Sequence, residues 1–428
     1  MCSNQLGGAM TIYMGVDWET KNIRCQWTQD LKKTKPIKGC KPLLHEVDDL
    51  IQRLLERAKA KKDEQVHVII EAGSVYWVNL FHQVGVIVHV IDPKKARRFA
   101  QTLCSSGAKD DRRDARVLLE MGRSIAHCPP PFSPKDEPEQ KINTLQKALQ
   151  RQLETKKRMA QQLRSVLRQR MPMVEATIKS IDSDWAIKVL SRAPTLYHLK
   201  KLSDKQRKKL LESSKIHDKT EKKFWKAVDT EQAPWINKEL ANIEGIEVKG
   251  TLGTIKALKK SIKNLDKELE KALEQHDIAS RILEIPGMGK KLTSAVIVSG
   301  ALDDPENRNG LAIKMGAAPV FCGSGTNKHG KAKGHVKMRR SSSSFLRRSS
   351  FLSGRLCSQN TKWGKAMLED GLQQGQSYGT IYRRIARSLF RIIQAIVRTG
   401  EHYDEDRYIR ALKRKGVKWA QNIECLVA

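Results

Sequence analysis

The sequence predicts an α/β N-terminal domain followed by a mainly helical chain. Short apolar, β-branched runs alternate with stretches of helical spacing over residues 11–126. The proline-rich segment Pro129–Pro134 then interrupts the chain as a stiff linker, and mostly helical sequence follows it. We therefore expect five parts: an α/β domain (11–126), a linker (127–136), a helical and coiled-coil region (137–280), a mainly helical domain (281–412) and a basic tail (413–428).

The order of elements within residues 11–126 can be predicted from these runs. Ile12–Asp17 and Ile23–Thr28 resemble the two arms of a hairpin with its turn near Glu19. The elements expected after it are a helix (Leu44–Lys61), a strand (Val66–Glu71), a helix (Tyr76–Val84), a strand (Val86–Ile91) and a basic helix with Lys94, Lys95, Arg97 and Arg98.

Four acidic residues in this domain predict a metal site. Asp17 and Glu71 each end an apolar strand, and Asp111 and Asp114 are three residues apart on one helix face. Charged groups at the ends of buried strands are costly unless they are paired or bind a cation. Carboxylates are hard ligands suited to Mg²⁺, in the arrangement that cuts or transfers phosphodiesters. Any one of them could be an ordinary surface acid or helix cap, but four in this order favour the metal site.

The charge of the chain indicates a polyanionic partner. Lysine and arginine number 80 against 47 acidic residues, which gives a formal net charge of +33. The net charge is +4 over residues 1–140, +13 over 141–280 and +16 over 281–428. This distribution favours nucleic acid over a membrane surface, with the bases concentrated away from the acids.

Cysteine spacing and hydropathy indicate the compartment. The eight cysteines include no C-x-x-C pair, which argues against a zinc ribbon and fits reduced thiols. No segment reaches the length of a membrane-spanning helix, and the N-terminus lacks a signal-peptide core. We expect a soluble cytoplasmic protein with no membrane partner.

The middle of the chain is predicted to be helical. One helix is expected from Ile142 to Met171, where Pro172 stops it. The Lys-rich stretch 197–228 could be a mobile insertion or a basic clamp. A short coiled-coil seam follows, which could pack within one subunit or form a dimer interface; its members are Ile255, Leu258, Ile262, Leu265, Leu269 and Ala272.

The C-terminal part carries a hairpin-like motif and a closing helix. Ile285-Pro-Gly-Met-Gly resembles the hairpin of a helix-hairpin-helix module, with glycines that let backbone N–H groups approach a phosphate. Lys290 and Lys291 add charge to that helix start. The spacing of apolar residues in Ile381–Val397 predicts an amphipathic helix.

Ser324 lies between two glycines in a segment without acids. No acidic residue occurs between Glu306 and Glu369. An exposed, conformationally free hydroxyl beside many cations suits attack on a phosphodiester, although Gly-Ser-Gly is also a common flexible loop. Serines 341–344 could be solvated or contact phosphate. The expected phosphate contacts in this segment are Lys328, Lys331, Lys333, Lys337, Arg339, Arg340, Arg347 and Arg348.

Together these motifs resemble the DEDD/serine transposases of the insertion-sequence one-ten and eleven-eleven group, relatives of the pilin-gene invertase. The resemblance covers about 11–126 and 240–412. Its marks are Gly15-Val-Asp17, the Glu71 strand, the Asp111 and Asp114 run, Ile285-Pro-Gly-Met-Gly, Gly316-Ala-Ala-Pro319, Ser324-Gly325 and the basic segment to Arg348. Stretch 197–228 looks longer than the family usually carries, and Gly334–Ser341 fits its basic signature loosely.

The resemblance implies an RNase H-like (RuvC-type) domain, a coiled-coil middle and a serine-bearing transposase domain. It also implies a homotetramer that works in the bacterial cytoplasm, associated with the nucleoid, with a structured guide (bridge) RNA that pairs with donor and target DNA. We therefore expect an RNA-guided DNA recombinase in which Asp17, Glu71, Asp111 and Asp114 hold Mg²⁺, for which Mn²⁺ can substitute, and Ser324 attacks the DNA. Acids and serine would meet when the domains dock, across subunits.

A DNA invertase and two other functions remain open at this point. A RuvC-like junction endonuclease would use water as the nucleophile, with Ser324 only a loop residue. A basic nucleic-acid packaging protein would need no catalysis, and it leaves the four acids unexplained.

Overall fold

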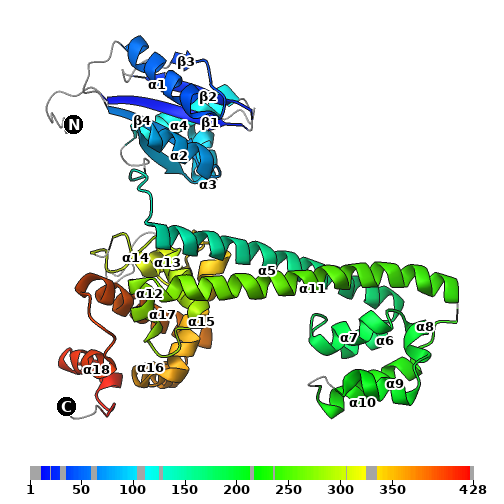
Figure 1. Cartoon of the computed structure of the whole chain (residues 1–428). Coiled ribbons are helices and arrows are strands. Elements are labelled where there is room, and N and C mark those ends of the chain that lie inside the picture. Colours follow the sequence, from blue (N-terminus) through cyan, green and yellow to red (C-terminus); the bar gives the residue numbers. More distant parts are fainter. Residues whose placement is uncertain are drawn as a thin grey trace. The chain divides into compact units, whose positions relative to one another are not determined.

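The computed structural model describes residues 11–19, 21–28, 35–58, 65–103, 111–124, 129–212, 216–234, 237–304, 306–323 and 335–424. The chain divides into two compact units: unit 1 is Met1–Pro134 and unit 2 is Lys135–Ala428 (Figure 1). No helix in the described part of the chain is long and apolar enough to cross a membrane.

Unit 1 is built on a five-stranded sheet with the order β3-β2-β1-β4-β5. The strands are β1 (Thr11–Trp18), β2 (Ile23–Thr28), β3 (Lys35–Ile37), β4 (Gln65–Glu71) and β5 (Ile87–Ile91). β2 is antiparallel to both β1 and β3, whereas β1, β4 and β5 run parallel. The predicted hairpin and the two later strands are confirmed. The sequence analysis missed β3, because a three-residue strand that contains Pro36 shows no alternation.

Helices cover both faces of this sheet. They are α1 (Leu44–Ala58), α2 (Val75–Gln83), α3 (Pro93–Leu103) and α4 (Asp111–Arg123). α1 and α2 share a hydrophobic cluster with Met14 and Val16 of β1. α3 and α4 pack against Ile69 and Ile91 on the other face. Alternate residues of the central strands thus face two cores, as the two-residue period of a strand requires. The predicted extension of α1 to Lys61 lies outside the described residues.

α4 approaches the sheet most closely at two glycines. A Cβ atom on Gly15 of β1 would overlap the carbonyl oxygen of Ala115 and lie 2.5 Å from the backbone nitrogen of Leu119. A Cβ atom on Gly122 of α4 would overlap the side chain of Ile69 on β4. Helix and strand backbones can therefore approach more closely than larger residues would allow.

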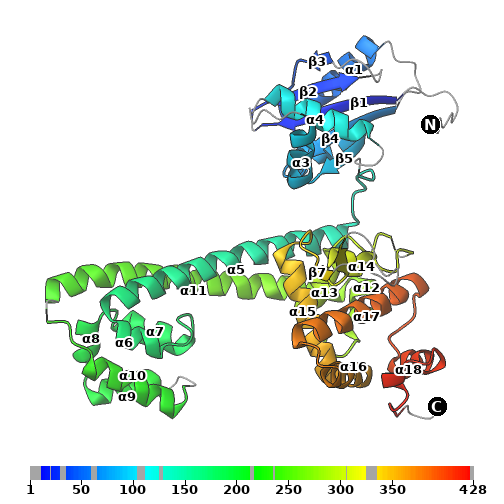
Figure 2. The ribbon, with the colours of Figure 1, turned by 180° about the vertical axis from the view of Figure 1, so that it is seen from behind.

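Two long helices, α5 (Glu137–Arg170) and α11 (Lys238–Glu274), lie side by side in unit 2 (Figure 2). At 1.5 Å per residue, α5 is about 50 Å long and α11 about 55 Å. They are antiparallel. The start of α5 shares a hydrophobic cluster with the end of α11, and the end of α5 shares another with the middle of α11.

The predicted coiled-coil seam lies on α11. Ile255, Ile262, Leu269 and Ala272 are buried, and Leu258 and Leu265 are half-buried. Residues of α5 occur in the same clusters as all of these side chains except Leu258. Packing within one subunit, one of the two arrangements left open by the sequence, is therefore present.

The chain between the long helices folds into α6 (Pro172–Thr177), α7 (Asp184–Arg192), α8 (Leu196–Lys200), α9 (Asp204–Leu211) and α10 (Asp218–Thr230). They enclose a hydrophobic cluster that includes the fully buried Phe224. Two buried carboxylates fasten this group. Glu175 pairs with Arg164 at 2.6 Å, and Glu231 accepts two backbone N–H groups of α6. The described part of 197–228 is thus folded helix with its own core.

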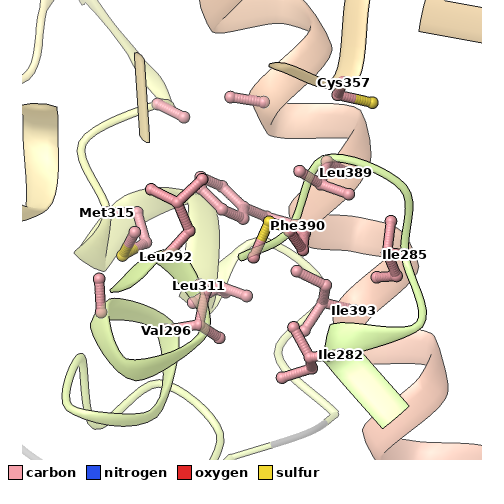
Figure 3. Packing of buried hydrophobic residues seen from close by; sticks show 14 of the residues in the cluster. Ile282, Ile285, Leu292, Val296, Leu311, Met315, Cys357, Leu389, Phe390 and Ile393 are labelled. Carbon is pink, nitrogen blue, oxygen red and sulfur yellow. The ribbon is translucent and has the colours of Figure 1, made fainter. Parts of the chain in front are cut away.

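The remainder of unit 2 is mainly helical, as predicted. Its elements are α12 (Asp277–Leu283), α13 (Lys290–Ile297), α14 (Gly310–Lys314), β6 (Pro319–Cys322), β7 (His335–Met338), α15 (Ser344–Asn360), α16 (Lys362–Gln373), α17 (Tyr378–Thr399), α18 (Glu405–Arg414) and the 3₁₀ turn Lys418–Ala420. In Figure 3, Ile285 and Leu292 pack in one core with Phe390 and Ile393 of α17. α17 is the predicted closing helix.

The α4 contact gives a direct stability test. We expect Gly15→Ala to destabilise unit 1 by about 3 kcal/mol, because the added methyl group meets backbone that cannot move alone. Gly253→Ala on α11 is the matched control, since a Cβ atom there would meet nothing within 4 Å. That change should stabilise the helix by about 0.5–1 kcal/mol. Urea unfolding of both variants measures the difference, and equal effects would contradict the close approach of α4.

Candidate active site

Two of the predicted acids end neighbouring parallel strands. Val16 of β1 pairs with Ile70 of β4, so the next residues on the two strands are Asp17 and Glu71. Both carboxylates therefore lie at the carboxyl edge of the sheet, Asp17 one residue before the end of β1 and Glu71 at the end of β4. On its other side Asp17 pairs in register with Arg24 of β2.

α4 brings the other two acids to the same edge. Asp111 and Asp114 occupy its first turn, where negative charge is favoured by the helix dipole. The Ala115 backbone lies against Gly15, two residues before Asp17, so the start of α4 is directed towards the end of β1. Both acids are half-buried.

The pKa of Asp17 indicates that these acids lie close together. The pKa of the Asp17 carboxyl is raised from its ordinary 3.8 to about 6, first by burial and then by the negative charges of Asp114, Asp111, Glu71 and Glu19, in that order. Glu19, which follows the predicted site by two residues, also belongs to this neighbourhood. Five carboxylates therefore share the edge, and their mutual repulsion disfavours ionisation of the central one.

The donor set fits a hard divalent cation. Within the described ranges no three His, Cys, Asp or Glu side chains lie close enough together to hold a metal ion as they stand. Charge–charge effects extend further than ligand bonds, so the acids are neighbours without being at ligand distance. Oxygen ligands of this kind suit Mg²⁺ or a similar ion, whose charge would offset the repulsion around Asp17.

The lysines of the hairpin motif are ion-paired in the structure. Lys290 and Lys291 begin α13, where Lys290 pairs with Glu270 and Lys291 lies 3.4 Å from Asp266, both acids on α11. Gly287 has a φ of +90°, and a Cβ atom there would lie 3.0 Å from the Leu356 backbone. This glycine therefore packs against α15. A phosphate contact by the two lysines stays a prediction, and it would compete with their ion pairs to Glu270 and Asp266.

The other predicted cations that are described lie around the start of α15. Lys337 on β7 is exposed, as is Arg340 after it. Arg347 donates to the carbonyl oxygen of Arg340 at 3.0 Å, and Arg348 is exposed. Of the predicted serine run, Ser343 caps α15 by accepting from the backbone N–H of Leu346. Ser324, Lys328, Lys331 and Lys333 lie outside the described residues.

The sequence analysis did not assign a function to the arginines of α17. Arg383, Arg387 and Arg391 recur every four residues, which was interpreted only as the polar side of an amphipathic helix. Their spacing without intervening acids was the signal that could have marked them.

Comparison with known proteins agrees with the acidic edge. Residues 14–172 match the family model of the DEDD transposases of IS110 elements, described as a transposase, and this span contains Asp17, Glu71, Asp111 and Asp114. A Streptomyces coelicolor protein named as the transposase of the IS117 mini-circle is 23% identical over 418 residues, 93% of this chain and 97% of that protein. The uncharacterised 43.6 kDa protein of IS110 from the same organism is 23% identical over 319 residues, 73% of this chain and 76% of that protein.

The matched span resembles the DEDD class of transposases and contains all four acids of the predicted site. Within that class, the family match and the two relatives support an IS110-family transposase. The family suggests a requirement for a divalent metal, in agreement with the crowded carboxylates.

The raised pKa of Asp17 predicts that removing its charge stabilises the fold, by an amount that depends on pH. The folded state binds this proton more tightly than the unfolded state, so metal-free protein loses stability as pH rises from about 4 to about 6. A shift of this size corresponds to about 3 kcal/mol, and solvent screening of a half-buried group reduces it to about 1–2 kcal/mol. In EDTA, Asp17→Asn should therefore be more stable than the parent protein above pH 6, with no difference near pH 4.

Chemical denaturation at a series of pH values measures this difference. Asp48→Asn, an exposed acid on α1, is the control and should change stability little at any pH. A loss of stability in Asp17→Asn at pH 7 would contradict crowding at this carboxylate.

Proposed function

We propose that this transposase is a DNA recombinase that cuts and rejoins donor and target DNA with a metal-dependent acidic site and a serine nucleophile. The observation that carries the proposal is the convergence of four carboxylates on Asp17 at one sheet edge. The sheet order, with a hairpin beside parallel strands, supports an RNase H-like assignment for unit 1. Mg²⁺, or Mn²⁺ in its place, would polarise the scissile phosphate and help to deprotonate the nucleophile.

The acids and the serine have separate roles in this proposal. Asp17 and Glu71 are positioned by paired strands, and Asp111 and Asp114 by a helix packed on the sheet, so the acids are held by rigid elements. Ser324, between Gly323 and Gly325, is the proposed nucleophile. Its attack would replace a DNA phosphodiester by a serine–phosphate ester, which conserves the bond energy for rejoining.

The family resemblance supports three further proposals. A guide RNA would select donor and target, the active protein would be a homotetramer, and acids and serine would come from different subunits. Sequencing of RNA that copurifies with the protein, and the mass of the assembled protein on DNA, test the first two.

Neutralising the acids tests the metal site. We expect Asp17→Asn and Asp111→Asn to abolish strand cleavage, because each removes a charged oxygen ligand, while DNA binding stays within about twofold. Cleavage of labelled element ends in Mg²⁺ and Mn²⁺, with binding measured on the same preparations, gives both values. Folded variants that still cleave would show that the acids are structural.

Trapping on a suicide DNA substrate tests the serine. We expect a covalent protein–DNA adduct whose peptide contains Ser324, dependent on a divalent cation and on Asp17. Ser324→Ala should form none, and Ser324→Cys at most a trace. An adduct on another residue would remove Ser324 from the mechanism, while cleavage without any adduct would favour the junction endonuclease.

A further inference from the structure

One face of α17 carries a row of arginines. Arg383, Arg387 and Arg391 are four residues apart, so they follow one another along the helix. Arg383 and Arg387 are half-buried and Arg391 is exposed. We call these three residues the α17 arginine row. Four residues of helix rise about 6 Å, so the row covers about 12 Å.

None of the three forms an ion pair with a described carboxylate. Arg383 donates to the sulfur of Met338 at 3.9 Å, and Arg391 donates to the side-chain oxygen of Asn309 at 3.0 Å. The Nε atom of Arg387 is buried and has no hydrogen-bond partner among the described residues.

The neighbouring Arg384, in contrast, has a carboxylate partner. It donates to Gln376 at 2.7 Å and lies 3.9 Å from the carboxylate of Asp370. Asp370 lies on α16, and the sequence has no acid from 307 to 368.

The row is also electrostatically strained. Burial lowers the pKa of the Arg387 guanidinium, and the charge of Arg391 lowers it further. Like charges four residues apart destabilise a helix, and a half-buried cation without a counter-charge is costly. Arg339, after β7, likewise has a buried Nε atom without a described partner, and it follows Met338, which Arg383 contacts. The uncompensated cations therefore continue from α17 to the end of β7.

We propose that Arg383, Arg387 and Arg391 bind the phosphodiester backbone of one DNA strand. The proposal rests on the proposed function of the chain as a DNA recombinase. Guanidinium groups form paired hydrogen bonds with phosphate oxygens, and an anion beside the row would offset the repulsion between its charges. A strand rises about 3.4 Å per nucleotide, so a 12 Å row would follow about three to four nucleotides. Contacts of this kind set the register of the DNA without reading its sequence.

The salt dependence of binding tests this proposal. The triple variant Arg383→Gln, Arg387→Gln and Arg391→Gln should bind duplex DNA of arbitrary sequence more weakly. Losing three phosphate contacts should reduce the slope of log K against log salt by about 2.7. Fluorescence anisotropy with the full-length protein over a salt series measures the slope.

A second triple variant controls for net charge. Arg410→Gln, Arg414→Gln and Lys415→Gln remove the same three charges from exposed positions on and after α18. The control should leave the slope unchanged. Equal slope changes in both triple variants, or none in the α17 variant, would overturn the proposal.

Thermal melting and a second nucleic acid complete the test. Without ligand, the α17 variant should melt at the parent temperature or above it, since it loses repulsion rather than ion pairs; a marked loss would assign the row a structural role instead. A slope change seen only with an RNA hairpin would overturn the assignment to DNA. Asp17-dependent cleavage with an unchanged slope would reject the row and leave the proposed function intact.

Discussion

The backbone contact between α4 and β1 at Gly15 determines the acidic edge. Asp17 and Glu71 come together through strand pairing alone, but Asp111 and Asp114 lie on a helix that no hydrogen-bond ladder aligns with them. A shift of α4 by one turn would move these carboxylates about 5.4 Å. The absence of a Cβ atom at Gly15 removes the freedom to shift, because the Ala115 carbonyl occupies that space. The geometry of the proposed site therefore depends on one missing methyl group.

Unit 2 carries many positive charges, and its fold must remain stable despite their mutual repulsion. Its long helices join two hydrophobic cores, so stability does not depend on the charged surface between them. Where bases come close to acids they are neutralised, as Lys290 is by Glu270. On α17 the same composition leaves the arginine row without carboxylate partners among the described residues. Cations with partners stabilise the fold, and cations without them remain available to an anion.

Much of unit 1 could be predicted because its signals are local. The apolar runs of β1, β4 and β5 and the amphipathic spacing of α1 determine their own structure. The three-residue β3 could not be found, since its existence depends on pairing with β2. The four acids were identified from their positions at strand ends and on one helix face, whereas Glu19 was noted only at the turn of the hairpin. Whether they converge depends on packing between α4 and the sheet, which no local pattern encodes.

In unit 2, too, local patterns were predictable from the sequence and long-range contacts were not. The seam of α11 was predicted from its period, but the length of the helix was not, and the partner of the seam, α5, lies about a hundred residues earlier. Basic residues near glycines drew attention to Lys290 and Lys291, which the fold pairs with acids of α11. The arginines of α17 were given no function in the sequence analysis, because an amphipathic helix is expected to have a charged side. Only the fold shows which charges lack a partner.

The distribution of charge between the units has a consequence for the order of events. Five crowded carboxylates repel a phosphate backbone until a cation offsets them, so the acidic edge by itself disfavours DNA. The cations of unit 2 attract the same backbone without needing a metal. Under the proposed function, we expect DNA to bind the cations of unit 2 first and to approach the acidic edge once a divalent ion offsets its charge. Under the same proposal, monovalent salt would control DNA binding, and the divalent metal would control cleavage.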